Sequence, residues 1–147
     1  MLKSSHAHIL NMSPPLEMLS QWFAPHVAYT MAKFGMSMCV LGMSEEFKEQ
    51  GVAVNALWPR TSIHTAAVDM LHGSEGAKYS RTTDIMADAA YAILSKTPKS
   101  CTGNFFIDED VVLEAGVKDL KQYACFPENA DKLQNDFFLP QKYYSKL

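Results

Sequence analysis

The chain has 147 residues, of which 48% are hydrophobic and 20% are charged, and its formal net charge is −3 at pH 7. This length and apolar content predict one domain with a real hydrophobic core, and they exclude disorder as the main state. The apolar runs are far shorter than the roughly 20 residues that a membrane helix needs, so no membrane span is expected. No Lys/Arg block occurs, which argues against nucleic-acid binding.

The three cysteines, Cys39, Cys101 and Cys125, are widely spaced and form no C-x-x-C motif. This pattern predicts reduced thiols in an intracellular compartment, with neither a disulfide framework nor a cysteine-rich zinc site. We expect residues 1–126 to form the folded domain and residues 127–147 to form a flexible tail. The tail ends in Ser145-Lys146-Leu147, the S-K-L tripeptide that a peroxisomal import receptor reads at a free C-terminus. The predicted location is therefore the peroxisome, with the mitochondrion and the cytoplasm as alternatives.

Residues 7–12 are mostly apolar and precede Ser13-Pro14-Pro15, so they predict a buried strand that ends in a rigid turn. A loop containing Trp22 and Phe23 is expected next. A long helix is then expected over residues 26–49, because apolar side chains recur at steps of three and four. That stripe consists of Val27, Met31, Phe34, Met38, Leu41 and Phe47. Gly35 and Gly42 predict close packing on one face of the helix.

The second half of the chain predicts two further strands, at residues 52–58 and 103–108, and a helix from Thr83 to about Ser95. The apolar face of that helix consists of Ile85, Ala89, Ala92 and Ile93. Residues 60–83 predict a long loop with one short helix. Strands that alternate with helices predict an α/β fold in which three parallel strands are joined by crossover helices. Ligands of such sheets bind beyond the carboxyl ends of the strands, where Ser13, Pro59 and Asp108 are located.

Tyr29 and Lys33 are one helical turn apart near the start of the predicted helix, and therefore share a face. A phenol acts as an acid or base near pH 7 only where its ionised form is favoured, and a lysine charge and a helix N-terminus both do so. Spacing alone favours an ordinary pair on a helix surface. The surrounding residues favour the catalytic interpretation.

Four segments together resemble the short-chain dehydrogenase/reductase family: His8–Pro15, Ala28–Met38, Asn55–Pro59 and Ile63–Ala67. The similarity covers about residues 5 to 110. It implies the second half of a doubly wound, Rossmann-like fold. It also implies hydride transfer between a nicotinamide cofactor and a carbonyl or alcohol, with a lipid-like substrate. NADP is the expected cofactor, and NAD is not excluded.

The resemblance assigns roles to single residues. Tyr29 would be the acid or base, Lys33 would favour its phenolate and bond the ribose hydroxyls, and Ser13 would hold the substrate oxygen. The stretch after Pro59 would line the nicotinamide, with the Ile63 backbone on the carboxamide and Thr65 nearby.

The sequence departs from the family pattern in three respects. Arg60 stands where glycine usually follows the proline, and Asp108-Glu109-Asp110 replaces the common Asp-Gly-Gly. The glycine-rich turn that holds the cofactor pyrophosphate at a helix N-terminus does not occur in these 147 residues. Strand 7–12 would therefore carry an unpaired edge.

The sequence is compatible with two functions. The first is a peroxisomal oxidoreductase of the short-chain type. The second is a non-catalytic half-domain that is a partial gene product or acts as an interaction partner. It would pair with full-length relatives, or form homo-oligomers, through the helix at 26–49.

Overall fold

The computed structural model describes residues 3–24 and 26–144. The chain divides into two compact units. The first unit contains Met1–Trp58, Ile93–Phe106 and Phe137–Leu147, and the second contains Pro59–Ala92 and Ile107–Asp136. The predicted catalytic residues belong to the first unit and the predicted nicotinamide loop to the second, so each is described within its own unit.

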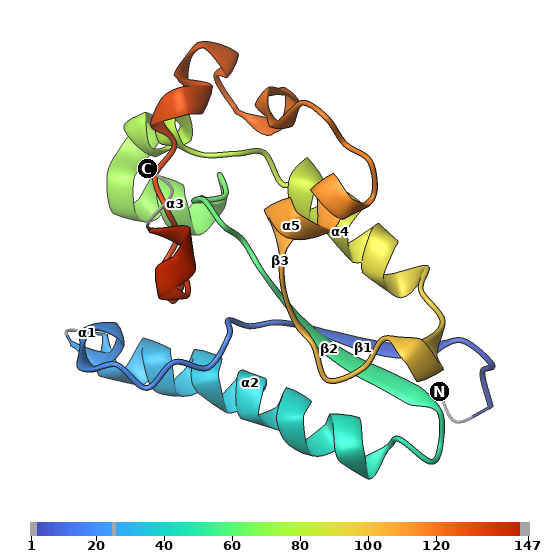
Figure 1. Ribbon diagram of the computed structural model, residues 1–147. Helices are drawn as coiled ribbons and strands as arrows, with labels where there is room; N and C mark the ends of the chain where they lie inside the picture. Colours follow the sequence, from blue (N-terminus) through green and yellow to red (C-terminus); the bar gives the residue numbers. More distant parts are fainter. Residues whose placement is uncertain (1–2, 25, 145–147) are drawn as a thin grey trace. The chain divides into compact units, whose positions relative to one another are not determined.

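Three parallel strands form one sheet in the order β1-β2-β3 (Figure 1). They are β1 (Ala7–Met12), β2 (Val52–Trp58) and β3 (Phe105–Ile107). Strand β1 pairs with β2 in parallel, from Ala7 opposite Val52 to Met12 opposite Leu57. The first two strands agree with prediction to the residue, whereas β3 is shorter than the predicted 103–108 because Asp108 already begins a helix. The predicted α/β class with a parallel sheet is confirmed.

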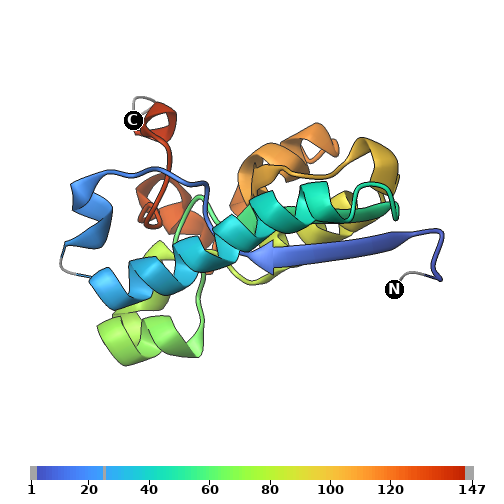
Figure 2. The same cartoon turned by 90° about the horizontal axis from the view of Figure 1, so that it is seen from below.

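All seven residues of β2 are buried, as expected for the central strand of a parallel sheet. Its residues Val54 and Ala56 form a hydrophobic cluster with Val40 of the long helix α2 (Val27–Glu46). Helix α2 runs alongside β1 and β2 in both views (Figures 1 and 2). The carboxyl end of β1 therefore lies beside the N-terminal half of this helix.

Asn55 is a fully buried polar residue within β2. Its Nδ2 donates to the carbonyl oxygen of Cys101 at 2.8 Å. Its Oδ1 accepts from the backbone N–H of Asn104 at 3.0 Å and from the side chain of the same residue at 2.9 Å. A buried amide with its hydrogen bonds formed avoids the cost of desolvation. Asn55 thus fixes the turn that leads into β3.

The long helix is confirmed, but its predicted apolar stripe is right only for Phe34, which is buried, and Phe47, which packs against the core. The buried residues of α2 are Thr30, Phe34, Ser37 and Val40. Of the predicted stripe, Val27, Met31, Met38 and Leu41 are between 51% and 64% exposed. Thr30 and Ser37 are buried because their hydroxyls bond carbonyl oxygens beside the helix, so the buried face is rotated from the one that apolar periodicity predicts.

Two smaller expectations for this region are also wrong. Trp22 and Phe23 belong to a short helix, α1 (Ser20–Phe23), and not to a loop. A Cβ added at Gly35 or Gly42 would meet no described atom within 4 Å, so neither glycine marks a close approach in the described structure.

The second unit contains α3 (Ala66–His72), the 3-10 helix η1 (Gly73–Tyr79) and α5 (Asp108–Glu114). Two further 3-10 helices follow, η3 (Leu120–Tyr123) and η4 (Pro127–Lys132). The predicted loop at 60–83 is therefore more helical than expected. Helix α4 (Asp84–Leu94) begins in this unit and ends in the first. It buries Ile85, Ala89 and Ile93 as predicted, whereas Ala92 is only half-buried.

The interpretation of residues 127–147 as a flexible tail misses their packing. Phe138, Leu139 and Tyr143 are buried, and the segment contains the 3-10 helix η5 (Gln141–Tyr143). Because the segment is mostly polar, its composition did not predict that a few of its aromatic residues are buried. The targeting tripeptide, Ser145-Lys146-Leu147, lies outside the described residues.

Candidate active site

The predicted catalytic side chains of the first unit are located where β1 ends and α2 begins. Ser13 directly follows β1, and Tyr29 and Lys33 lie on the first two turns of α2. The Lys33 ammonium donates a hydrogen bond to the carbonyl oxygen of Met12 at 3.1 Å. The structure therefore brings Lys33 next to the residue that precedes Ser13, although 21 residues separate Lys33 from Met12 in sequence.

Two buried hydroxyls hold the same side of α2. Ser37 Oγ donates to the carbonyl oxygen of Pro14 at 2.6 Å, and Thr30 Oγ1 donates to the carbonyl oxygen of Trp22. Both hydroxyl residues are 0% exposed. Hydrogen bonds that satisfy buried groups are costly to break, so these two fix how α2 is rotated about its axis and hence the direction of Tyr29.

Tyr29 is 46% exposed and stacks on Phe138, with the ring centroids 5.9 Å apart and the ring planes at 23°. Phe138 is 2% exposed, and the rings of Trp22, Phe34 and Trp58 surround it at 5.7, 5.2 and 5.9 Å. Such offset pairs add stability beyond the area they bury. Tyr29 is thus supported by an aromatic cluster from four parts of the chain.

Phe138 is a functional candidate that sequence reasoning missed. Its φ is 63°, in the left-handed region that a bulky side chain rarely adopts. Backbone strain of this kind costs about 1–3 kcal/mol and persists only where the surroundings enforce it. The Phe137-Phe138 pair in an otherwise polar segment was the one available signal.

Ser13 is 0% exposed, and its Oγ has no hydrogen-bond partner among the described residues. A buried hydroxyl without a partner costs about 1–3 kcal/mol. Contact with a substrate oxygen would require an accessible hydroxyl, so the covering groups would have to move for Ser13 to serve as predicted.

The predicted nicotinamide loop lies in the second unit. Pro59 and Ile63 are buried, and Thr65 is the exposed residue that precedes α3. Arg81 holds the loop by two backbone hydrogen bonds: its N–H donates to Ser62 O at 2.9 Å, and its carbonyl oxygen accepts from the N–H of His64 at 2.8 Å.

Because Ser62 and His64 make the hydrogen bonds to Arg81, the backbone N–H of Ile63, between them, points away from Arg81. No hydrogen bond of the Ile63 N–H occurs within residues 3–24 and 26–144. This N–H is the group that the family resemblance assigns to a carboxamide.

A buried charge cluster lies beside this loop. Glu109 accepts from Arg81 Nη1 at 2.9 Å and forms an ion pair with Arg60 Nη1 at 3.5 Å. The side chains of Arg60, Arg81 and Glu109 are at most 16% exposed. Arg60 and Glu109 both replace residues of the family pattern, and the structure pairs them with each other.

Asp108 is fully buried in the same cluster. Its Oδ1 accepts from the backbone N–H groups of Arg60 at 2.8 Å and Glu109 at 2.6 Å, and its Oδ2 has no described partner. Burial raises the pKa of Asp108 to about 6, and the two backbone hydrogen bonds partly oppose that rise.

Each unit carries groups that suit part of a nicotinamide cofactor. In the first unit, Lys33 and Tyr29 are polar side chains of the kind that binds ribose hydroxyls. In the second unit, the Ile63 N–H is a donor without a partner in the described ranges, which suits a carboxamide oxygen. These 147 residues contain no glycine-rich turn for the pyrophosphate.

Membrane-spanning and metal-binding features are both missing from the described ranges 3–24 and 26–144. No helix there is long and apolar enough to cross a membrane. No group of three or more His, Cys, Asp or Glu side chains in these ranges could hold a metal ion.

The chain is similar to known proteins in both sequence and structure. No family model matches it. It is 62% identical over 139 residues to hydroxysteroid dehydrogenase-like protein 2 of Xenopus tropicalis, a match that covers 95% of this chain and 32% of that protein. A Xanthomonas campestris crystal structure, provisionally described as a dehydrogenase, has a TM-score of 0.87 and 45% identity over 95% of this chain and 50% of its own.

A short-chain dehydrogenase homologue from Mycobacterium thermoresistibile has a TM-score of 0.83 and 42% identity, covering 97% of this chain and 51% of its own. The chain is similar over 95% or more of its length to short-chain dehydrogenase structures, as the resemblance in its sequence predicts. It spans about a third of the curated relatives that it matches, such as the Xenopus tropicalis hydroxysteroid dehydrogenase-like protein 2, and about half of the solved structures.

Phe138→Ala should lower the free energy of unfolding by about 3–5 kcal/mol, because it removes a buried aromatic ring from a packed cluster. Urea denaturation followed by circular dichroism measures this. The neighbouring Phe137 is 50% exposed, so Phe137→Ala should cost clearly less. Equal losses in the two variants would contradict the packing described.

Asp108 should make stability depend on pH. Because its pKa of about 6 in the folded chain lies above the ordinary value of 3.8, the folded chain holds the proton more tightly than the unfolded chain does. The contribution of Asp108 to the free energy of unfolding should therefore fall as pH rises from about 4 to about 6, by up to roughly 3 kcal/mol. Denaturant titrations of the wild type and of Asp108→Asn across this range should differ in slope, and parallel curves would refute the assignment.

Proposed function

We propose that this chain is the catalytic half of a short-chain dehydrogenase domain, which transfers hydride between a nicotinamide cofactor and a lipid-like carbonyl or alcohol. The observation that supports the proposal is the hydrogen bond from Lys33 to Met12, which brings Lys33, one helical turn from Tyr29, next to the residue that precedes Ser13. The short-chain dehydrogenase relatives support the same reaction class.

Tyr29 exchanges a proton with the substrate oxygen at its Oη. Its ring is half-exposed, and stacking on Phe138 limits the directions that the phenol can take. The residue lies in the first turn of α2, where the helix dipole favours negative charge, and Lys33 one turn away supplies a positive charge. Both effects favour the phenolate.

Ser13 is assigned to the substrate oxygen because its buried Oγ has no partner among the described residues and can donate once the groups that cover it move. Lys33 would bond the ribose hydroxyls of the cofactor. The loop Pro59–Thr65 would line the nicotinamide ring, with the Ile63 N–H on the carboxamide. A bound nicotinamide supplies the hydride donor or acceptor.

NADP is the proposed cofactor on the family resemblance, with NAD as the alternative. The angucycline C-6 ketoreductase LanV is described with bound NADP, and at 20% identity its likeness to this chain shows the fold alone. The peroxisome is the proposed location, reached through an import receptor that reads Ser145-Lys146-Leu147.

The alternative proposal is a non-catalytic half-domain that associates with a second copy. It is favoured by the exposed apolar side chains of α2, Val27, Met31, Met38 and Leu41. An exposed patch of this kind is typical of an interaction surface. The position of β1 at the edge of the described sheet supports association as well.

Tyr29→Phe should lower kcat by about 10²–10⁴-fold, because it removes the proton that moves in the transition state. Affinity for NADPH should change little. Tyr91, 76% exposed on α4, supplies the matched control, and Tyr91→Phe should keep full turnover of NADPH with a panel of lipid-like ketones. Unchanged turnover in Tyr29→Phe would remove Tyr29 from the mechanism.

The polypeptide for this assay is first captured from cells with an antibody to residues 127–144, and its mass is measured. A mass well above 16.4 kDa identifies a longer protein, in which the variants are then made. A polypeptide of 16.4 kDa without turnover on any ketone would favour the non-catalytic alternative.

Met31→Glu should abolish self-association if α2 is the interface, because it places a charge among apolar side chains. Sedimentation equilibrium of the chain should show a dimer that this variant reduces to a monomer. Met70 on α3 is 80% exposed and lies outside α2, so Met70→Glu should leave the dimer intact. A wild-type chain that is monomeric at high concentration would exclude this interface.

A further inference from the structure

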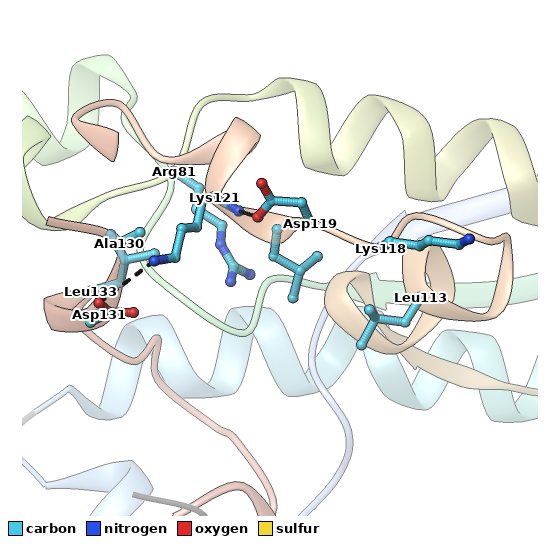
Figure 3. A pocket seen from close by; sticks show the side chains of 9 residues that line it. Arg81, Leu113, Lys118, Asp119, Lys121, Ala130, Asp131 and Leu133 are labelled. Atoms are coloured by element: carbon cyan, nitrogen blue, oxygen red, sulfur yellow. Dashed lines mark hydrogen bonds and ion pairs between the residues drawn. The ribbon is translucent and has the colours of Figure 1, made fainter. Parts of the chain in front are cut away.

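The second unit contains a pocket that includes none of the residues assigned to the dehydrogenase site. Its volume is about 310 Å³, at the lower end of the range for ligand pockets. Helix α5, the residues that follow it and the 3-10 helices η3 and η4 supply most of its wall (Figure 3). The pocket is lined by Arg81, Leu113, Lys118, Asp119, Leu120, Lys121, Ala130, Asp131 and Leu133.

Arg81 is the buried polar group of this pocket. Its side chain is 7% exposed. Nη1 donates to Glu109, whereas Nε is buried and has no partner, and no hydrogen bond within the described residues involves Nη2. The edge formed by Nε and Nη2 is one that binds a carboxylate through two parallel hydrogen bonds. An unpaired buried donor on this edge indicates that a ligand acceptor is missing.

The acidic side chains that line the pocket already have partners, so they do not prevent an anion from binding beside Arg81. The Asp119 carboxylate accepts from the backbone N–H of Lys121 at 2.9 Å, and Asp131 lies 3.8 Å from the Lys121 ammonium. Figure 3 shows both of these interactions as dashed lines. Lys118 forms no ion pair within residues 3–24 and 26–144. Both acidic side chains of the lining thus have positively charged or N–H partners, while one lysine has none.

The remaining wall of the pocket is apolar and consists of Leu113, Leu120, Leu133 and Ala130. A free inorganic anion would gain nothing from these side chains, whereas an aliphatic chain would bury area against them. At about 30 Å³ per water, the pocket holds the equivalent of about ten water molecules, which suits a small molecule and not a long acyl chain.

We propose that this pocket binds a small aliphatic carboxylate, with its carboxylate on the Nε–Nη2 edge of Arg81 and its chain against the three leucines. Lys118, which lines the pocket and forms no ion pair in the described ranges, adds long-range attraction for the anion. The site is separate from the proposed dehydrogenase chemistry, so binding here requires neither a nicotinamide nor catalytic turnover.

The proposal is tested with the full chain and sodium hexanoate as probe, by following ¹H–¹⁵N correlation spectra in a titration. Saturable shifts should appear at Lys118, Asp119, Leu120 and Lys121. Hexan-1-ol, which lacks the charge, and inorganic phosphate, which lacks the chain, should each bind at least about tenfold more weakly. Equal response to phosphate would mean a simple anion site and would overturn the proposal, as would the absence of hexanoate shifts.

Two variants locate the binding. Arg81→Lys keeps the positive charge but loses the planar guanidinium edge that donates two parallel hydrogen bonds. It should weaken hexanoate binding about tenfold or more. Because Arg81 is buried and could be needed for folding, Leu113→Asp serves as a second variant, since Leu113 is 44% exposed and a carboxylate there would repel the ligand. Leu71→Asp, at a residue 69% exposed on α3, should bind as the wild type does. Unchanged affinity in Leu113→Asp would place the ligand elsewhere.

Discussion

The hydrogen bonds between α2 and the chain that leaves β1 are the constraint on which the candidate active site depends. A carbonyl oxygen beyond the end of a strand lacks a ladder partner and must find a donor elsewhere. Met12 and Pro14 provide such carbonyls, and Lys33 and Ser37 donate to them. The same bonds therefore satisfy the end of the strand, orient the helix and set Lys33 beside the serine that follows β1. One set of contacts has both structural and chemical consequences.

Arg81 has a comparable double role in the second unit. Its backbone holds the loop Pro59–Thr65, and its side chain shares Glu109 with Arg60. Burying several charges costs free energy unless each finds partners, and here the backbone N–H groups and the arginines provide most of them. The atoms left without partners, Asp108 Oδ2 and Arg81 Nε, mark where the unit still responds to pH or to a ligand.

Sequence patterns did not predict which face of α2 is buried or that part of residues 127–147 is packed. The two differences have a common physical cause. Periodicity assigns apolar residues to the core, yet α2 buries Thr30 and Ser37 because their hydroxyls bond neighbouring carbonyls, and it leaves Met31 exposed. Composition marked residues 127–147 as polar, yet Phe138 completes an aromatic cluster under Tyr29. Both results depend on partners distant in sequence, which local patterns do not contain.

The sequence by itself determined the parallel α/β class, strands β1 and β2 to the residue, the existence of the long helix and the family. These follow from local pattern: apolar runs, turn residues and the serine, Tyr-x-x-x-Lys and Asn-x-x-x-Pro motifs together. Only the tertiary structure decided the rotation of α2, the covering of Ser13, the support of Tyr29 by Phe138 and the pairing of Arg60 with Glu109. Each of these is a contact between segments far apart along the chain, and such contacts arise only when the whole core packs.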